Sequence, residues 1–397
     1  MKLLKKTLFL LYIPILFSCS DKKSKISNQV IQKIPVQVEN KTTYAFDEIF
    51  EVVDLLTIKN SQNFPISKIN KIKKIEDNLW ILTSSIVLIT DLEGNLNNVI
   101  QSQGYGPLEY QKLSDIHWNP YLSLVEILDS DQGKIIRYDK NGVAKNEWKN
   151  KFLRLASSFY PQENKYWIYG GTFFDGDGGR LVVVDYQNDK KLNTYFPLGD
   201  ERNYLNVIEP NNFIAYNKSL LFFHTYNDTI YSIENDNLYP TYLLNFGPNR
   251  IPSEIFSQDF KDIMEFGQEL EKNGFVDLIN SIYFSEGNIF FRFFYEGKPI
   301  SAVYSIKNKS TKIIANWKNQ YGEGFSKLSS FLINMPIDSD GEFLYFSVDP
   351  YAIKSEAEKL QDDPNYDQFM LENPLIKKII DQFDNYENPY ILKLKAR

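Results

Sequence analysis

Short apolar segments and polar turns alternate along the chain, and this pattern recurs with a period of roughly 35–45 residues. Each period contains segments rich in aromatic and β-branched residues, which is typical of a four-stranded antiparallel unit. In the first unit, the apolar segments lie at residues 69–75, 79–82, 86–89 and 96–100, with a polar turn at residues 91–94. Later units contain the segments that begin at Ile116, Ser157, Ser219, Asn288 and Glu342. The pattern therefore predicts an all-β fold made of six repeated units.

A unit of this kind cannot bury both of its faces alone, so the copies must pack against one another. Six copies around an axis form a β-propeller, in which ring closure protects the strand edges. The last unit, with segments at 342–348 and 390–394, is short of a strand, which residues 49–58 are expected to supply. The alternative is a pair of β-sandwich domains, but the regular spacing over the whole length disfavours it. We therefore expect residues 43–397 to form a six-bladed β-propeller.

Two segments with helical periodicity interrupt the strands. In residues 252–273, apolar residues at helical spacing follow Ser253, which is the expected N-cap, and they end before Gly274. The second segment covers about residues 351–386 and splits the last unit; Pro374 there suits the first turn of a helix. Such small helical insertions either cover a ligand site or brace the blades, and bracing is the simpler interpretation.

The N-terminus has the features of a bacterial lipoprotein signal. Three lysines precede an apolar run at residues 7–17, which is too short to span a hydrocarbon core of ~30 Å. The run ends in Leu16-Phe17-Ser18-Cys19, and Cys19 is the only cysteine of the chain. We expect residues 1–18 to be a lipoprotein signal peptide, Cys19 to be the lipid anchor, and residues 19–42 to form a flexible tether. An ordinary signal peptide cut after Ser18 would leave an unpaired thiol instead.

Charge and composition exclude some classes of function. The formal charge is −7, and it becomes −10 when residues 1–18 are removed. A chain this acidic lacks the basic face that nucleic-acid binding requires. A single cysteine rules out an internal disulfide, although an exported location would permit one. The 29 Phe and 26 Tyr residues fit a protein with many strands.

The candidate catalytic and metal-binding residues have simpler structural explanations. The only two histidines, His117 and His224, each lie in a predicted strand. Two histidines and no structural cysteine disfavour a zinc centre, because such a site needs three or four ligands. The stretch from Asp175 to Gly179 starts like a calcium loop, but Tyr186 stands where that loop needs a glutamate, so a hairpin tip fits better. No serine lies in a Gly-x-Ser-x-Gly elbow. We therefore predict no catalytic residue, metal ligand or cofactor.

Three stretches resemble the six-bladed β-propeller lipoproteins of Gram-negative bacteria. Residues 104–110, Gly-Tyr-Gly-Pro-Leu-Glu-Tyr, resemble that family's G-x-G-P-G-E-[FY] link between the first two blades, with Leu108 in place of a glycine. This favours an inter-blade turn over a phosphate cradle at Gly104 and Gly106. Residues 226–247 and 387–394 are similar to the family's fourth blade and closing strand. The resemblance covers about residues 44–397 and implies the fold. It carries no established reaction, and members are often found beside outer-membrane nutrient-uptake systems.

Together these observations predict a non-enzymatic binding lipoprotein of the cell envelope, held in the membrane, with the outer membrane expected, by the lipid on Cys19. The expected binding surface is an axial funnel rich in Tyr and Phe, and the expected partner is a glycan, a peptide or an outer-membrane transport protein. The alternative is a propeller hydrolase or lyase that acts on a polysaccharide or peptide through Asp/Glu or a bound calcium. That alternative requires carboxylates to converge with Arg180 or Arg292 at the axial mouth.

Overall fold

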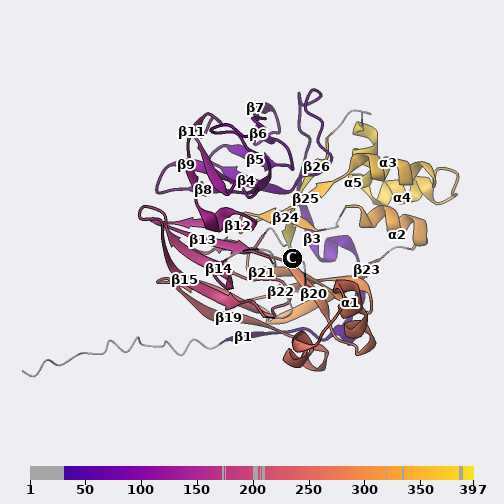
Figure 1. Cartoon of the computed structure of the whole chain (residues 1–397). Coiled ribbons are helices and arrows are strands. Elements are labelled where there is room, and N and C mark those ends of the chain that lie inside the picture. The colour runs from indigo at the N-terminus through magenta and orange to yellow at the C-terminus, as the bar shows by residue number, and fades with distance from the viewer. Residues whose placement is uncertain are drawn as a thin grey trace, which may run out of the picture.

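The described part of the chain forms six sheets of four or five strands with a few small helices (Figure 1). The computed structural model describes residues 31–171, 174, 176–199, 204, 205, 207, 211–318, 320–332, 335–383 and 388–397. The predicted signal peptide, Cys19 and most of the predicted tether lie outside these residues. The all-β prediction with small helical insertions is confirmed, and the arrangement is propeller-like.

The first three sheets are each a continuous antiparallel stretch of chain. Sheet 1 contains β4 (Lys71–Ile75), β5 (Asn78–Leu82), β6 (Val87–Asp91) and β7 (Leu96–Ile100). Sheet 2 contains β8 (Leu113–Asn119), β9 (Leu124–Asp129), β10 (Lys134–Tyr138) and β11 (Ala144–Lys149). Sheet 3 contains β12 (Ala156–Gln162), β13 (Lys165–Gly170), β14 (Gly179–Asp185) and β15 (Lys190–Pro197).

The other three sheets each include one strand from the N-terminal part of the chain. Sheet 4 contains β16 (Phe213–Tyr216), β17 (Ser219–Phe222), β18 (Thr229–Glu234), β19 (Asn237–Asn245) and β1 (Gln32–Pro35). Sheet 5 contains β20 (Asp277–Ser285), β21 (Asn288–Tyr295), β22 (Lys298–Ser305), β23 (Ser310–Trp317) and β2 (Thr42–Tyr44). Sheet 6 contains β24 (Pro336–Ser339), β25 (Leu344–Val348), β26 (Tyr390–Ala396) and β3 (Phe50–Leu56).

The predicted completion of the last sheet by an N-terminal strand is confirmed. β3 pairs antiparallel with β26, so that Phe50 lies opposite Ala396 and Leu56 lies opposite Ile391. β1 and β2 pair in parallel with β19 and β23, the outermost strands of the preceding two sheets. The expectation of a flexible tether as far as residue 42 is therefore wrong for its last part. Main-chain pairing and the burial of Ile34 already fix the chain from residue 32 onward.

Neighbouring sheets meet along their first strands. β4 lies beside β8, β8 beside β12, β12 beside β16, β16 beside β20, β20 beside β24, and β24 beside β4. Polar contacts link the same neighbours: Lys71 with Asp115, Asp115 with the Phe159 amide, Ser158 with Asn212, Asn211 with Tyr283, Ser339 with the Phe284 carbonyl, and Lys73 with Asp338. Each described sheet therefore has two neighbours.

The hydrophobic core is divided among the spaces between neighbouring sheets. One cluster joins sheets 1 and 2 around Trp80 and Ile127, and another joins sheets 3 and 4 around Trp167 and Phe222. Four similar clusters fill the remaining interfaces, and the last of them joins sheet 6 to sheet 1. Trp80 and Trp167 are fully buried. Much of the aromatic content therefore serves sheet-to-sheet packing and is not exposed in a funnel.

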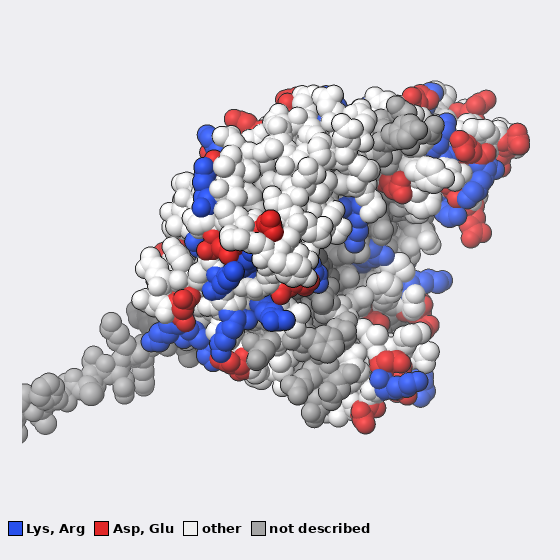
Figure 2. All heavy atoms as spheres, turned by 45° about the horizontal axis from the view of Figure 1, so that its top comes forward, with Lys and Arg blue, Asp and Glu red and all other residues white. Residues whose placement is uncertain are grey.

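The insertions lie at one end of the strands. Because neighbouring strands run in opposite directions, the connections after the second and fourth strands of each sheet lie at the same end. The short hairpins after the first and third strands lie at the other end. The helices occur in these connections: α1 (Ile263–Lys272), α2 (Glu323–Ser330), α3 (Pro350–Glu358), α4 (Tyr366–Glu372) and α5 (Pro374–Gln382). α3–α5 project from the sheets in Figure 1. Charged side chains of both signs crowd this projection, and the surface is hollowed between it and the sheets (Figure 2).

Two details of the helix predictions change. Ser253 begins a 3-10 helix (Ser253–Ser257), whereas the N-cap of α1 is Asp262, whose carboxylate accepts hydrogen bonds from the Met264 and Glu265 amides at 3.0 Å. An aspartate is an effective cap because it satisfies amides at the positive end of the helix dipole. Pro374 begins α5, as predicted, and α2 was not predicted.

The turn that resembles the family link has the left-handed backbone that a glycine would favour. Leu108 has a φ of 59°. Its amide donates to Glu147 Oε2 at 2.9 Å, and the buried Lys134 ammonium donates to the same oxygen. Burial alone would raise the pKa of Glu147, but these hydrogen bonds outweigh it and lower the pKa to about 2. An ionised side chain of sheet 2 therefore holds the link in place, which confirms an inter-sheet turn at Gly104 and Gly106.

Candidate functional site

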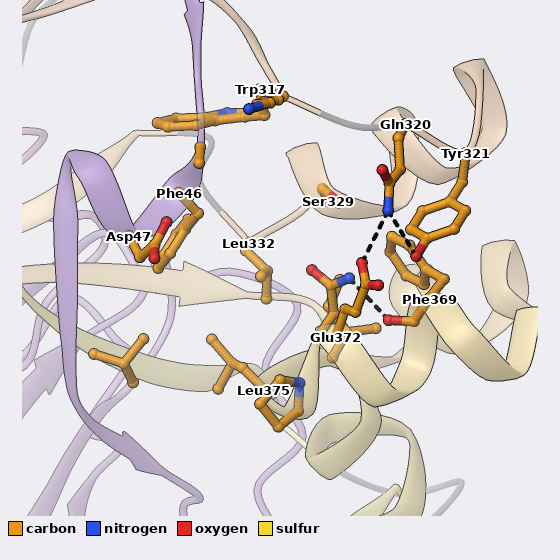
Figure 3. A pocket seen from close by; sticks show the side chains of 16 residues that line it. Phe46, Asp47, Trp317, Gln320, Tyr321, Ser329, Leu332, Phe369, Glu372 and Leu375 are labelled. Atoms are coloured by element: carbon orange, nitrogen blue, oxygen red, sulfur yellow. Dashed lines mark hydrogen bonds between the residues drawn. The ribbon is translucent and has the colours of Figure 1, made fainter.

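An aromatic pocket lies where sheets 5 and 6 meet the helical insertions. It has a volume of about 540 Å³ and is lined by β23, the segment between β2 and β3, α4 and α5. Its floor is apolar, with Leu332, Phe369 and Ile376 buried. Its walls include the half-buried side chains of Phe46 and Trp317. Figure 3 shows the indole of Trp317 across one side of the pocket, above Phe46 and Leu332.

The position of Trp317 is fixed by strand pairing and by aromatic packing. It is the last residue of β23 and lies opposite Tyr44 of β2. The next amide, that of Lys318, donates to the Tyr44 carbonyl at 2.7 Å. The indole centroid lies 6.0 Å from the ring of Phe46 and 6.1 Å from that of Phe50. The indole is therefore a rigid wall, because its backbone is paired with β2 and its ring packs against two aromatic rings.

The rim of the pocket is polar. Gln320 Nε2 donates to the Tyr321 hydroxyl at 3.0 Å and lies 3.4 Å from Glu372 Oε2 (Figure 3). Gln368 donates to the other oxygen of Glu372 at 2.9 Å. The hydrogen bond from Gln368 and that from Tyr321 lower the pKa of Glu372, so this carboxylate is ionised at neutral pH. Within the described part of the chain, Glu372 makes no ion pair.

A second cavity continues from the aromatic pocket. Its volume is about 950 Å³, and Trp317 and Lys318 line both spaces. Its lining is largely polar and includes Thr43, Ser301, Asn316, Ser326, Ser330 and Ser347, with the charged residues Arg292, Glu323 and Asp349. We refer to the two spaces together as the groove. The aromatic pocket, with its apolar floor and a few polar groups at the rim, has the usual chemistry of a small-molecule site, and the second cavity extends it with hydroxyl, amide and charged groups.

The two arginines singled out in the sequence lie in separate cavities. Arg292, on β21, lines the polar cavity of the groove together with Glu323 and Asp349. Burial lowers its pKa. The Asp349 carboxylate caps α3 by accepting hydrogen bonds from the Tyr351 and Ala352 amides. Arg180 lines a cavity of about 320 Å³ beside His224. Arg292 thus shares its cavity with two carboxylates, and that cavity is lined by strands of sheets 5 and 6 together with α2 and the start of α3.

The prediction that His224 lies within a strand is wrong, because His224 lies just after the end of β17. Its Nδ1 is 3.1 Å from the Thr225 carbonyl and its Nε2 is 2.9 Å from Asn227 Nδ2. Burial lowers its pKa to about 3, with a contribution from Arg180. The imidazole is therefore neutral and hydrogen-bonded, as expected of a structural histidine.

His117 belongs to a buried ionic cluster on the first strands of sheets 1 and 2. Its Nε2 lies 3.1 Å from Asp115 Oδ2, and the Lys71 ammonium lies 2.5 Å from Asp115 Oδ1. All three side chains are at least nine-tenths buried. Burial lowers the pKa of His117 to about 4 against the attraction of Asp115, so the ring is neutral at pH 7. Burial would raise the pKa of Asp115, but Lys71 and His117 outweigh it and the pKa lies well below its usual range.

The stretch that begins like a calcium loop is a connection between β13 and β14. Asp175 lies outside the described residues. The Asp177 carboxylate forms ion pairs with Lys191 at 2.9 Å and Lys151 at 3.4 Å, and Asp177 and Gly178 both have positive φ. These features fit the hairpin-tip interpretation. Across the described residues, no group of three or more His, Cys, Asp or Glu side chains is placed to hold a metal ion.

The sequence did not reveal the groove. The sequence pattern marks Trp317 only as the end of a strand, and it contains no signal for Phe46, Gln320 or Glu372. They come from three segments that are distant in the chain and meet only because β2 lies against β23 and the helical insertion of sheet 6 folds over both. The aromatic residue at the strand end, followed directly by polar residues and a helix, was the one local signal.

Comparisons with known proteins agree with the fold. The chain is similar to the crystal structure of a protein of Bacteroides fragilis that is described as exported, with a TM-score of 0.74, 15% identity, and coverage of 92% of this chain and 100% of that chain. A member of the DUF4221 family from Bacteroides vulgatus has a TM-score of 0.46 and 10% identity, over 88% of this chain and 99% of that chain. Because the sequence identity is low, the first similarity shows a shared fold and says nothing about function. The second similarity is too distant to support any conclusion.

No curated protein sequence matches the chain. Among the described helices, none has the length and apolar character needed to cross a bilayer. The model of one family, described as a domain of unknown function (DUF4934), matches residues 30–395. This match spans nearly the whole region that the structure describes, and the chain therefore belongs to the DUF4934 family.

Proposed function

We propose that this chain is a lipoprotein of the cell envelope whose six sheets are the blades of a closed six-bladed β-propeller, and that it binds a ligand in the groove without a chemical reaction. The contacts between successive first strands, including those between β24 and β4, support a closed ring. So do the six hydrophobic clusters, each of which fills the space between two neighbouring sheets. Ring closure would protect the first and last sheets from edge-to-edge association.

The sequence Leu16-Phe17-Ser18-Cys19 supports a lipid anchor. The body begins at β1 on the edge of sheet 4, whereas the groove opens between sheets 5 and 6. Residues 19–31 can span at most roughly 40 Å when extended. The anchor would thus hold the groove near a membrane, with the outer membrane as the proposed location, without occupying the groove.

Replacement of Cys19 by alanine is expected to release the protein from the membrane fraction. The reason is that several acyl chains give stable attachment, whereas a cleaved or unprocessed chain without them has no comparable anchor. Fractionation of cells and metabolic labelling with a radioactive fatty acid measure this directly. Ser20→Ala is the matched control and should keep both the label and the membrane location. Retention of the label by Cys19→Ala would contradict the anchor.

The groove is the observation that carries the proposed binding function. The aromatic pocket of about 540 Å³ is within the range of 300–1,000 Å³ that is usual for small-molecule sites. An apolar floor inside a polar rim is also the arrangement in which a few central side chains provide most of the binding energy. The proposed ligand is a glycan, a peptide or a segment of an outer-membrane transport protein.

Trp317→Ala is expected to reduce the affinity for the ligand by at least about tenfold, because a central aromatic side chain usually dominates such a site. Binding is measured by calorimetry on the purified protein, after a screen of oligosaccharides and peptides by thermal shift. Tyr121→Ala is the matched control, since Tyr121 is 56% exposed in the hairpin between β8 and β9. Equal affinities of wild type and Trp317→Ala would contradict the site.

A further inference from the structure

We infer that the groove binds a neutral oligosaccharide, with one sugar ring stacked on Trp317. This inference rests on the proposed binding function and narrows it to one class of ligand. It depends on four features of the groove: the aromatic wall, the polar groups of the rim, the charge around the aromatic pocket and the form of the second cavity.

The aromatic wall suits the apolar face of a sugar ring. Trp317 is half-buried and held by Phe46 and Phe50, so binding requires little ordering of the indole. Figure 3 shows the indole plane spanning one side of the pocket. A flat, rigid aromatic surface provides a large contact area at a low entropic cost. A ring with C–H groups on one face can stack there while its hydroxyls point to the rim.

The rim provides the polar groups that hydroxyls need. The Glu372 carboxylate is ionised and accepts from three neutral partners, so about one of its roughly four acceptor sites is left for a hydroxyl of the ligand. Gln320 offers an amide next to it, and the exposed Asp47 stands on the other side of the pocket. Carboxylate and amide groups can bond two adjacent hydroxyls together, and such charge-assisted hydrogen bonds are the stronger kind.

The charge of the rim disfavours an acidic sugar. Among the described residues that line the aromatic pocket, Asp47 and Glu372 carry two negative charges and Lys318 carries one positive charge. A uronate or sialate in this pocket would place its carboxylate against a net negative site, and like charges are repelled at short range. A neutral sugar meets no such repulsion.

The common modes of peptide recognition fit the groove poorly. A peptide that adds a strand would pair with β2 or β3, the edge strands of sheets 5 and 6, and of these two strands only Val52 lines the aromatic pocket. A peptide helix needs an extended apolar channel, whereas here the space beyond Trp317 is lined mainly by hydroxyl and charged groups. A polar continuation suits the next sugar of a chain, which is why the ligand is an oligosaccharide and not a single sugar.

The test is a glycan array with neutral, acidic and amino sugars, run beside a peptide library, on the purified protein. Maltohexaose, cellohexaose, xylohexaose and mannohexaose are the neutral probes for calorimetry and for quenching of tryptophan fluorescence. We expect at least one neutral series to bind and the affinity to rise from the disaccharide to the hexamer. Trp317→Ala should weaken this binding at least about tenfold and Trp317→Phe less, because phenylalanine keeps a stacking face.

Glu372→Gln provides a second variant at an exposed position, where misfolding is not expected. It should weaken the same sugar several-fold, while Tyr121→Ala should have no effect. Binding of peptides alone, or of acidic sugars alone, with loss in Trp317→Ala would overturn the neutral-saccharide inference and leave the binding function standing. Binding of neutral sugars that is unchanged in Trp317→Ala would overturn the location. Absence of binding to every probe would overturn both.

Discussion

Replacement of Asp115 by alanine is expected to lower the free energy of unfolding by about 3–5 kcal/mol, because it leaves the buried Lys71 without its counter-charge. The Asp115 side chain is fully buried, and only 4% of the Lys71 side chain is exposed. Asp115 also accepts hydrogen bonds from the Ile116 amide at 2.8 Å and the Phe159 amide at 3.0 Å. Removal of its carboxylate thus leaves several buried donors unsatisfied and breaks contacts among sheets 1, 2 and 3. Urea unfolding followed by circular dichroism measures the change.

Two controls separate burial from charge. The pair of Lys140 and Glu76 is 58% and 50% exposed, so Glu76→Ala should cost less than about 1 kcal/mol. The double variant with Lys71→Met and Asp115→Leu removes both charges and should recover the part of the loss that comes from the unpaired Lys71 charge. The part that comes from the Ile116 and Phe159 amides should remain, because leucine accepts no hydrogen bond. A cost below about 1 kcal/mol for Asp115→Ala would contradict the structural role of this cluster.

Removal of the chain before residue 58 is expected to prevent cooperative folding. This deletion takes away β3, leaves β26 as an exposed edge and removes the buried side chains of Ile49, Phe50 and Leu55. Full burial of each such side chain stabilises a protein by about 1.5–3 kcal/mol, so the loss is roughly 5 kcal/mol or more. That is comparable with the whole stability of a typical domain. Calorimetry and gel filtration test the result, with an aggregated or non-cooperative product expected.

The matched control is a chain that begins at residue 31, which keeps β1, β2 and β3. It should unfold cooperatively at the temperature of the mature protein. Phe50→Ala provides a test without truncation and should cost about 3–5 kcal/mol, because Phe50 packs against Phe290, Phe346 and Trp317. A soluble, cooperatively folded chain without residues 1–57 would contradict the role of β3.

Prediction from the sequence succeeded where a local pattern was enough. Strands such as Asn78–Leu82 and Lys165–Gly170 show continuous runs of apolar residues, because both of their faces are covered by neighbouring sheets. The role of residues 49–58 followed from counting strands, since an incomplete last unit requires a partner. The inner strands β16, β20 and β24 were missed. They carry polar residues such as Asn280 and Asp338 near the centre of the molecule, where apolar alternation breaks down.

The extent of the tether and the position of the binding site were not predictable in the same way. Residues 32–44 are polar in composition, yet their main chain completes the edges of sheets 4 and 5. Hydrogen bonding of the backbone has little dependence on side-chain polarity, so composition alone suggested disorder. The prediction of an axial binding funnel rests on the high aromatic content of the chain. In the structure, aromatic residues such as Trp80 and Trp167 are instead buried between sheets.

The sequence by itself determined the repeated four-stranded unit, the small helical insertions and the strand exchange between the two ends of the chain. These follow from periodicity, turn residues and the need to complete each unit, all of which are local or countable. Only the tertiary structure decided that Phe46, Trp317 and Glu372 meet in one groove, and that Lys71, Asp115 and His117 form one buried cluster. The physical reason is that such sites form by packing between segments far apart in the chain. The hydrophobic pattern within one segment does not specify which distant segment packs against it.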